Sequence, residues 1–222
     1  GLIFNPYNPL NVKITLCEVQ SILSKYGLPP NVRKLELYQR AFVHRSYTKR
    51  PQYENAEQNM IQLKELGVKV IDFTGGEPLL HQQLDELLRL AKKYKFITTV
   101  TTNTLLYPKY ALRLKGLVDM LHFSLDSADE EKHNLSRGVK CYDKFVESLS
   151  VAQAIGERPD ILYTVTKDNI HEIEEVYYKF CLPNKYVLIL NPVFEYNQVG
   201  ENMNEQDLNQ LLQWGNKKYI YL

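Results

Sequence analysis

The chain has 222 residues, of which 44% are hydrophobic and 24% charged, as is ordinary for a globular protein with one core and room for a small extra lobe. No apolar run is long enough to cross a bilayer, and no signal-like segment opens the chain, so we expect a cytoplasmic protein without a membrane partner. The three cysteines, Cys17, Cys141 and Cys181, are far apart and lack metal-ligand spacing.

The net charge of +1 is divided unevenly along the chain. Residues 1–53 hold eight Lys or Arg and two Asp or Glu, a net charge of +6, whereas the remaining residues carry −5. This asymmetry predicts two parts of different role, a basic helical head over residues 1–54 and a larger body over residues 55–222.

The head begins with an irregular lead-in over residues 1–14, since two Asn-Pro pairs interrupt it. Thr15 and Glu18 form a capping-box pattern for a helix that Gly27 closes. A second helix is expected over residues 32–44, and its exposed side and the residues that follow are basic: Arg33, Lys34, Arg40, Arg45, Lys49 and Arg50.

Three stretches of the head, residues 8–11, 17–26 and 37–47, resemble the N-terminal helices of ribonuclease III domains. The metal-binding helix of that family, Glu-x-x-Glu-Phe-x-Gly-Asp, does not occur in this sequence, which argues against catalysis because two-metal cleavage needs clustered carboxylates. The resemblance implies a fragment of that fold, with a weak contact to RNA through the basic face. The simpler alternative is a solvated helical cap.

After a joint at residues 51–55, helical and strand patterns alternate regularly. Helices are expected over residues 56–66, 82–94, 109–115, 128–133, 142–155, 170–180 and 205–214. Strands are expected over residues 68–73, 96–101, 120–125, 161–165 and 186–190, before an apolar tail over residues 219–222. Five strands that alternate with helices predict an α/β fold with a parallel sheet or a partial (β/α) barrel.

The most informative stretch is residues 68–80, VKVIDFTGGEPLL, which predicts a buried parallel strand followed by a glycine turn. Gly75 and Gly76 would let the backbone approach a ligand closely, since neither has a side chain. Glu77 adds a carboxylate at the C-terminal end of the strand, where parallel α/β folds bind ligands, and Pro78 restricts its peptide. An ordinary βα turn with two glycines is the alternative.

Polar residues also end each of the later strands through residue 165. Thr102 and Asn103 end one, Ser124 and Asp126 the next, and Thr164, Thr166 and Asn169 a fourth. Arg137 follows in a loop and could hold a carboxylate. Surface polarity explains one such strand end, but it explains less well why each of these strands has one.

Residues 59–196 resemble the core of radical S-adenosylmethionine enzymes. The matching motifs are FTGGEPLL at residues 73–80, TTN at 101–103, FSLDS at 123–127, RG at 137–138 and VTKDN at 165–169. The resemblance implies a partial TIM barrel with S-adenosylmethionine across the strand ends. It implies these cofactor-binding residues: Thr74, Gly75, Gly76, Glu77, Pro78, Thr102, Asn103, Ser124, Asp126, Arg137, Val165, Thr166 and Asn169.

Within this set the resemblance implies separate roles. The segment 75–77 would take the methionine amino group, and Arg137 would lie near the methionine carboxylate. Ser124 and Asp126 would lie near the ribose, and residues 165–169 near the adenine. No catalytic residue, metal ligand or substrate is assigned.

One departure from the family is large. The family holds a [4Fe–4S] cluster with three cysteines, usually CxxxCxxC, in the loop after the first strand, and this sequence has only Cys17 in that region. Three explanations stay open: a natural, engineered or artefactual fusion replaced the cluster segment, the protein is a degenerate homologue, or the cluster loop is missing from the sequence.

Three functions are therefore compared. The first is a radical S-adenosylmethionine protein whose family chemistry is reductive cleavage of the cofactor to a 5′-deoxyadenosyl radical. The second is a non-catalytic S-adenosylmethionine-binding or interaction module that keeps the barrel. The third is a ribonuclease III-like protein for double-stranded RNA that lacks its catalytic carboxylates.

Overall fold

A computed structural model describes residues 14–25, 27–35, 38, 56–193 and 203–222. The chain forms two compact units, Gly1–Ala56 and Glu57–Leu222. No helix among the described residues is long and apolar enough to cross a membrane.

The described part of the first unit centres on helix α1, Leu16–Lys25. Its predicted capping box is confirmed: the Thr15 N–H donates to Glu18 Oε2 at 2.7 Å, and the Glu18 N–H donates to Thr15 Oγ1 at 3.3 Å. Most of the second predicted helix, the basic residues from Arg40 onward and the joint at residues 51–55 lie outside the described residues.

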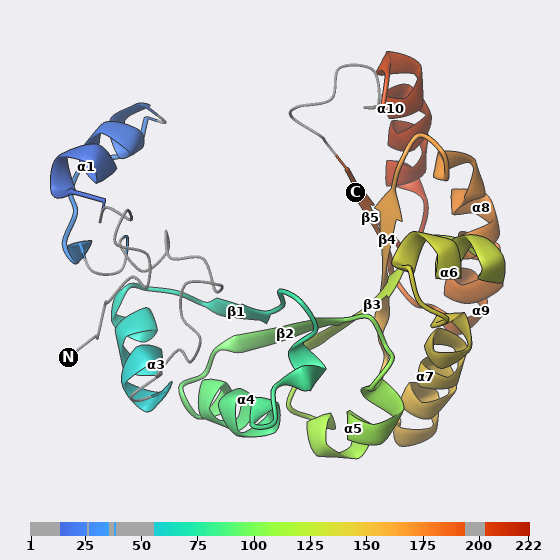
Figure 1. Cartoon of the computed structure of the whole chain (residues 1–222), viewed down its shortest axis with the longest axis horizontal. Coiled ribbons are helices and arrows are strands. Elements are labelled where there is room, and N and C mark those ends of the chain that lie inside the picture. Colours follow the sequence, from blue (N-terminus) through green and yellow to red (C-terminus); the bar gives the residue numbers. More distant parts are fainter. Residues whose placement is uncertain (1–13, 26, 36–37, 39–55, 194–202) are drawn as a thin grey trace. The chain divides into compact units, whose positions relative to one another are not determined.

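The second unit alternates strands with helical segments (Figure 1). Its strands are β1 Val70–Phe73, β2 Ile97–Thr102, β3 Met120–Leu125, β4 Asp160–Val165, β5 Leu188–Pro192 and β6 Ile220–Tyr221. Its α-helices are α3 Ala56–Glu65, α4 Leu84–Lys93, α5 Tyr107–Leu114, α6 Glu130–Arg137, α7 Tyr142–Ile155, α8 Ile173–Val176, α9 Leu182–Asn184 and α10 Glu205–Leu212. Shorter helical turns are η2 Pro78–Leu80, η3 Ile170–Glu172, the π-turn η4 Tyr177–Cys181 and η5 Gln213–Asn216.

The strands form one parallel sheet in the order β1-β2-β3-β4-β5-β6, so each strand pairs with its neighbours along the chain. The parallel α/β prediction is therefore confirmed. The described residues form one strand more than the five expected, because the tail at residues 219–222 contains β6. Pairing links β1 only to β2 and β6 only to β5, so within the described residues the sheet is an open, partial barrel.

One face of the sheet carries the core, because alternate strand residues point toward the helices. The fully buried positions on this face include Val100, Phe123, Ile161 and Leu188, each 0% exposed. Figure 1 shows α4, α5, α7, α8 and α9 along the outer side of the curved sheet. The predicted apolar face of α4 agrees with this arrangement, since Leu84, Leu88 and Ala91 are buried.

The opposite, inner face of the sheet is more polar and more open. It carries Asp72, Thr101, His122 and Asp160. Strand register places His122 beside both Thr101 and Asp160, and Asp72 beside Thr99. The prediction of a buried first strand is wrong: β1 starts at Val70, which is 44% exposed, and alternates between exposed and half-buried residues. Within the described part of the chain β1 is an edge strand, and Val70 and Asp72 on its inner face are exposed.

Several other boundaries differ from the predicted ones, and the predicted helix over residues 170–180 is divided into η3, α8 and η4; two of the differences have clear local reasons. Helix α6 starts at Glu130, later than predicted, because Asp129 is its N-cap and accepts a hydrogen bond of 2.9 Å from the Lys132 N–H. Strand β5 starts at Leu188, two residues later than expected, since the left-handed Lys185 ends the preceding helical turn and the Tyr186 N–H donates back to the Cys181 carbonyl at 3.0 Å.

Candidate functional site

The glycine turn after β1 leaves space at the strand end. Gly75 and Gly76 have φ angles of +86° and +57°, a region that favours glycine. A Cβ added at Gly75 would meet no atom within 4 Å. The turn therefore combines a conformation that disfavours other residues with open space beside its backbone, and a ligand could approach it closely.

Glu77 binds this turn to the end of β2. Its Oε1 accepts hydrogen bonds from the Leu79 N–H at 3.0 Å and from Thr102 Oγ1 at 2.7 Å. Its Oε2 accepts from the Asn103 N–H at 2.8 Å. The carboxylate thus fixes the relative position of two loops, and it retains acceptor capacity, since each ionised oxygen can accept two hydrogen bonds.

Thr102 and Asn103 serve this junction differently. The Thr102 side chain is buried, at 1% exposure, and its oxygen also accepts from the Thr104 N–H at 3.1 Å. The Asn103 side-chain oxygen accepts from the Leu105 N–H at 3.1 Å. Thr102 is therefore a structural contact of Glu77, whereas the half-buried Asn103 keeps part of its surface accessible.

Asp126 and Arg137 form an ion pair beyond the end of β3. Arg137 Nη2 lies 2.6 Å from Asp126 Oδ1, and Ser136 Oγ donates to Asp126 Oδ2 at 2.8 Å. The Asp126 side chain is 10% exposed and the Arg137 side chain 25% exposed. Arg137 Nε is buried without a hydrogen-bond partner among the described residues. The pair therefore neutralises the Asp126 carboxylate, while the buried Nε donor of Arg137 remains unused among the described residues.

The buried His133 contacts the backbone of Asp126. The Asp126 N–H donates to His133 Nδ1 at 3.2 Å, so the neutral ring carries its proton on Nε2, which lies 3.3 Å from Cys141 Sγ. Burial lowers the pKa of His133 to about 4, and the nearby Arg137 charge acts in the same direction. Burial also raises the pKa of the Cys141 thiol, so this pair is a neutral structural support.

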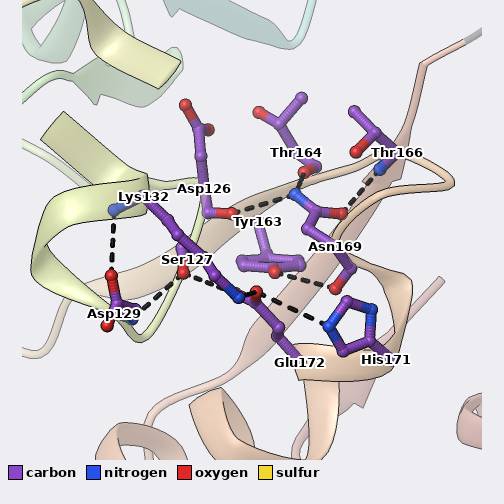
Figure 2. A network of polar contacts seen from close by, with 10 residues as sticks. All are labelled: Asp126, Ser127, Asp129, Lys132, Tyr163, Thr164, Thr166, Asn169, His171 and Glu172. Carbon is purple, nitrogen blue, oxygen red and sulfur yellow. Dashed lines mark hydrogen bonds and ion pairs between the residues drawn. The ribbon is translucent and has the colours of Figure 1, made fainter. Parts of the chain in front are cut away.

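Asn169 joins the ends of β3 and β4 (Figure 2). Its Nδ2 donates to the Asp126 carbonyl at 2.9 Å and to the Thr164 carbonyl at 2.8 Å, and its Oδ1 accepts from the Thr166 N–H at 2.7 Å. The Tyr163 hydroxyl donates to the Asn169 carbonyl at 3.1 Å. The Asn169 side chain therefore shapes the loop that carries it.

Two clusters thus emerge from the predicted residues. Glu77, Thr102 and Asn103 form one, and Asp126, Arg137, Thr166 and Asn169 form the other, both at the C-terminal edge of the sheet. The remaining predicted residues differ in exposure: Thr74, Gly75 and Gly76 are exposed, Ser124 is half-buried, and Pro78 and Val165 are buried. The Val165 side chain is 0% exposed and belongs to the core, so only its backbone could meet a ligand.

Three residues that sequence reasoning did not select also belong to the second cluster. The buried Glu172 accepts hydrogen bonds from Ser127 Oγ and from Lys132 Nζ, the latter at 2.5 Å (Figure 2). Ser127 lies inside the quoted FSLDS motif, and Glu172 follows Asn169 by three residues. A buried glutamate at that spacing gives no signal in the sequence, because its hydroxyl partner lies 45 residues away.

A further set of polar side chains, Thr101, His122 and Asp160, lies on the inner face of the sheet. His122 Nδ1 lies 3.3 Å from Thr101 Oγ1, and His122 Nε2 lies 3.9 Å from Asp160 Oδ2. Burial raises the pKa of Asp160, although His122, a backbone hydrogen bond from Val187 and Arg158 oppose the shift. These three residues place hydrogen-bonding groups on the face opposite the core.

The cysteines do not form a cluster site. Cys141 and Cys181 are buried in the packing of the second unit, where burial raises the pKa of the Cys181 thiol to about 12, and the exposed Cys17 belongs to the first unit. No group of three or more His, Cys, Asp or Glu side chains that could hold a metal ion occurs among the described residues. Thiolate ligation of an iron–sulfur cluster therefore finds no matching donor set there.

The described part of the chain is an open, parallel (β/α) sheet with a Gly-Gly-Glu-Pro turn after β1 and polar residues at the following strand ends. The family model of the radical SAM superfamily matches residues 38–178, so the chain belongs to that superfamily. The match begins at Tyr38, inside the segment for which the sequence suggests a ribonuclease III-like head. That second resemblance stays a prediction.

Curated relatives share part of the chain. GTP 3′,8-cyclase of Petrotoga mobilis is 32% identical over 113 residues, which are 50% of this chain and 35% of that protein. A probable GTP 3′,8-cyclase of Sulfurisphaera tokodaii is 29% identical over 63% of this chain and 48% of its own length. AdoMet-dependent heme synthase of Nitratidesulfovibrio vulgaris is 29% identical over 53% and 32%, respectively. The chain thus spans less than half the length of these relatives.

Solved structures confirm the fold. SuiB of Streptococcus suis matches with a TM-score of 0.61 and 25% identity, over 71% of this chain and 38% of SuiB. The protein anSMEcpe, solved with AdoMet and a peptide, matches with a TM-score of 0.62 over 81% of this chain and 58% of its own. At 19% identity, the second likeness concerns the fold alone.

Proposed function

We propose that this protein binds S-adenosylmethionine at the C-terminal ends of β1–β4. The observation that carries the proposal is the open space at Gly75 next to the anchored carboxylate of Glu77, on the edge of the sheet where ligands bind in parallel α/β folds. Membership of the radical SAM superfamily and a relative named as AdoMet-dependent support it.

The two clusters divide the ligand between them. The segment 75–77 would receive the methionine amino group, with remaining acceptor capacity on Glu77. Arg137, whose side chain is 25% exposed beside Asp126, would lie near the methionine carboxylate. Ser124 and Asp126 would lie near the ribose, and residues 165–169, held by Asn169, near the adenine.

The family's radical chemistry requires an iron–sulfur cluster as its electron source, and the cysteines of this chain do not fit one. No CxxxCxxC occurs in the 222 residues, and two of the three thiols are buried with raised pKa values. No cleavage step is therefore assigned to this chain. This disagreement favours a second candidate function, a module that binds S-adenosylmethionine without cleaving it.

Titration calorimetry with S-adenosylmethionine tests the site through Gly75→Ala. The added methyl group would enter the open space, so we expect affinity to fall by about tenfold or more. Gly156→Ala is a matched control, since Gly156 ends α7 with a φ of +81° and equally open surroundings, and it imposes a similar backbone strain.

Two outcomes would contradict the proposal. The first is that the parent protein binds no S-adenosylmethionine at millimolar concentration. The second is that Gly75→Ala and Gly156→Ala bind equally well, because the strain would then account for any loss and the turn would not contact the ligand.

A further inference from the structure

Glu172 is a buried carboxylate in an unusual position for its charge. It is 6% exposed and ends the turn η3, three residues after Asn169. Burying a carboxylate without partners is unfavourable, because the charge loses its hydration and gains nothing in return. Glu172 therefore needs compensating contacts, and its partners show which parts of the chain it links.

The partners of Glu172 come from the loop after β3 and from α6 (Figure 2). Ser127 Oγ donates to Glu172 Oε2, and Lys132 Nζ lies 2.5 Å from Glu172 Oε1. His171 Nε2 lies 3.7 Å from the same Oε1. The Ser127 oxygen also accepts from the Asp129 N–H at 3.0 Å. One carboxylate thus connects the loop after β4 to both the loop and the helix that follow β3.

This connection adjoins the proposed adenosine end of the site. Ser127 directly follows Asp126, whose carbonyl accepts from Asn169. Asn169 in turn orders the Thr166 amide. Two side chains of the loop after β4 therefore bind the loop after β3: Asn169 through the Asp126 carbonyl, and Glu172 through the Ser127 hydroxyl.

We propose that Glu172 is a positioning residue that holds these two loops at the spacing which the adenosine part of the ligand requires. The inference rests on the proposed function, and Glu172 itself touches no ligand. A carboxylate suits this role because both main partners, the Ser127 hydroxyl and the Lys132 ammonium, donate hydrogen bonds. A glutamine would turn an N–H toward one of these donors while keeping the volume.

The first test needs no ligand and measures amide hydrogen exchange of the full chain by NMR. In Glu172→Gln we expect the Thr166 amide to exchange about tenfold faster, because local opening of its loop becomes easier. Glu174→Gln, an exposed position on the following helix, makes the same charge change and should leave this exchange unaltered. Unchanged protection of Thr166 in Glu172→Gln would overturn the proposal.

The second test compares two probes, S-adenosylmethionine and 5′-methylthioadenosine, which lacks the amino-acid end. Glu172→Gln should weaken both by a similar factor, about fivefold, because less of the protein has the adenosine loops in place. The ligand-induced NMR shifts of the Gly75 and Asn103 amides should persist at saturating S-adenosylmethionine. A general loss of structure would remove these shifts as well, which would contradict a positioning role.

A double-mutant cycle tests whether Ser127 and Glu172 act together on ligand binding. Since either substitution already breaks the hydrogen bond between Ser127 and Glu172, Ser127→Ala combined with Glu172→Gln should weaken binding of S-adenosylmethionine by less than the sum of the two single losses. Losses that simply add would show that the residues act independently and would overturn the inference. If the parent binds neither probe, the proposed function fails, and the exchange experiment still decides whether Glu172 positions the loops.

Discussion

Glu77 Oε2 accepts a 2.8 Å hydrogen bond from the backbone N–H of Asn103, although the two residues follow different strands. This contact makes the carboxylate part of the scaffold as well as a candidate ligand group. The glycine turn is therefore held against β2 before any ligand arrives, which reduces the ordering cost of binding.

Glu77→Gln should destabilise the protein. Three donors converge on the carboxylate, and an amide has one oxygen with which to accept them, so at least one donor loses its partner. We expect the free energy of unfolding to fall by about 1–2 kcal/mol, as measured by urea denaturation. Glu86→Gln, at an exposed position on α4, should cost only a few tenths of a kcal/mol. Equal stability of the two variants would show that the three contacts contribute nothing.

His133 should make stability depend on pH. Its pKa falls to about 4 in the folded protein from an ordinary 6.5, so the unfolded chain binds the proton more readily between these values. Stability is therefore complete above pH 6.5 and is lost as the pH falls. Between pH 7 and pH 5 the contribution should decrease by about 2 kcal/mol.

His133→Asn tests this pH dependence, because the Asn oxygen can still accept from the Asp126 N–H but does not titrate. The variant should be less stable than the parent at pH 7 and should lose less stability on acidification. Denaturation curves at pH 7, 6 and 5 measure both effects. Parallel pH profiles of parent and variant would assign the acid sensitivity to other groups.

Asp160→Asn should not destabilise the protein at pH 8. The pKa of Asp160 is raised, so its charged form is disfavoured in the folded state, and that cost is present above the folded pKa. Removing the charge should leave stability unchanged or raise it by about 1 kcal/mol, and the difference should vanish below the ordinary pKa of 3.8. Thermal denaturation at several pH values would measure this difference in stability between the parent and the variant. Asp168→Asn, at an exposed position, is the control. A loss above 1 kcal/mol would mean that pairing with His122 outweighs burial.

Anaerobic reconstitution with iron and sulfide should load far less than one [4Fe–4S] cluster per chain, since the sequence lacks CxxxCxxC. Iron and sulfide analysis measures the yield. Cys17→Ser is the control, because Cys17 is the exposed thiol and should account for adventitious iron. A yield close to one cluster per chain, together with cofactor-dependent formation of 5′-deoxyadenosine, would contradict this expectation.

Much of the fold follows from local patterns. The bounds of β3 and α7 agree with the sequence prediction, because an alternating apolar strand and a long helix that ends at Gly156 have clear signals. Strand β6 was missed, since two residues are too short for a pattern. The exposure of β1 could not be read from its apolar residues, because its edge position in the described sheet depends on how all the strands pair.

The site shows the same division between local and long-range information. The glycine turn and the polar strand ends are visible in sequence because their residue types have conformational or chemical reasons to be there. The pairing of Arg137 with Asp126 is not visible, although the residues are 11 apart, because a cation near a carboxylate could equally face a ligand. The Glu172 contacts are less visible still, since they depend on how two loops meet.

The consecutive order of the six strands also bears on how the chain acquires its structure. Among the described strands, each from β2 onward pairs with the one before it, and none inserts between two earlier strands. The sheet can therefore grow from β1 toward β6 as the polypeptide leaves the ribosome, with each new βα unit completing the edge left by its predecessor. Removal of β6 would expose β5 as the new edge and break no other strand pairing, so the sheet should tolerate shortening from that side better than loss of a central strand.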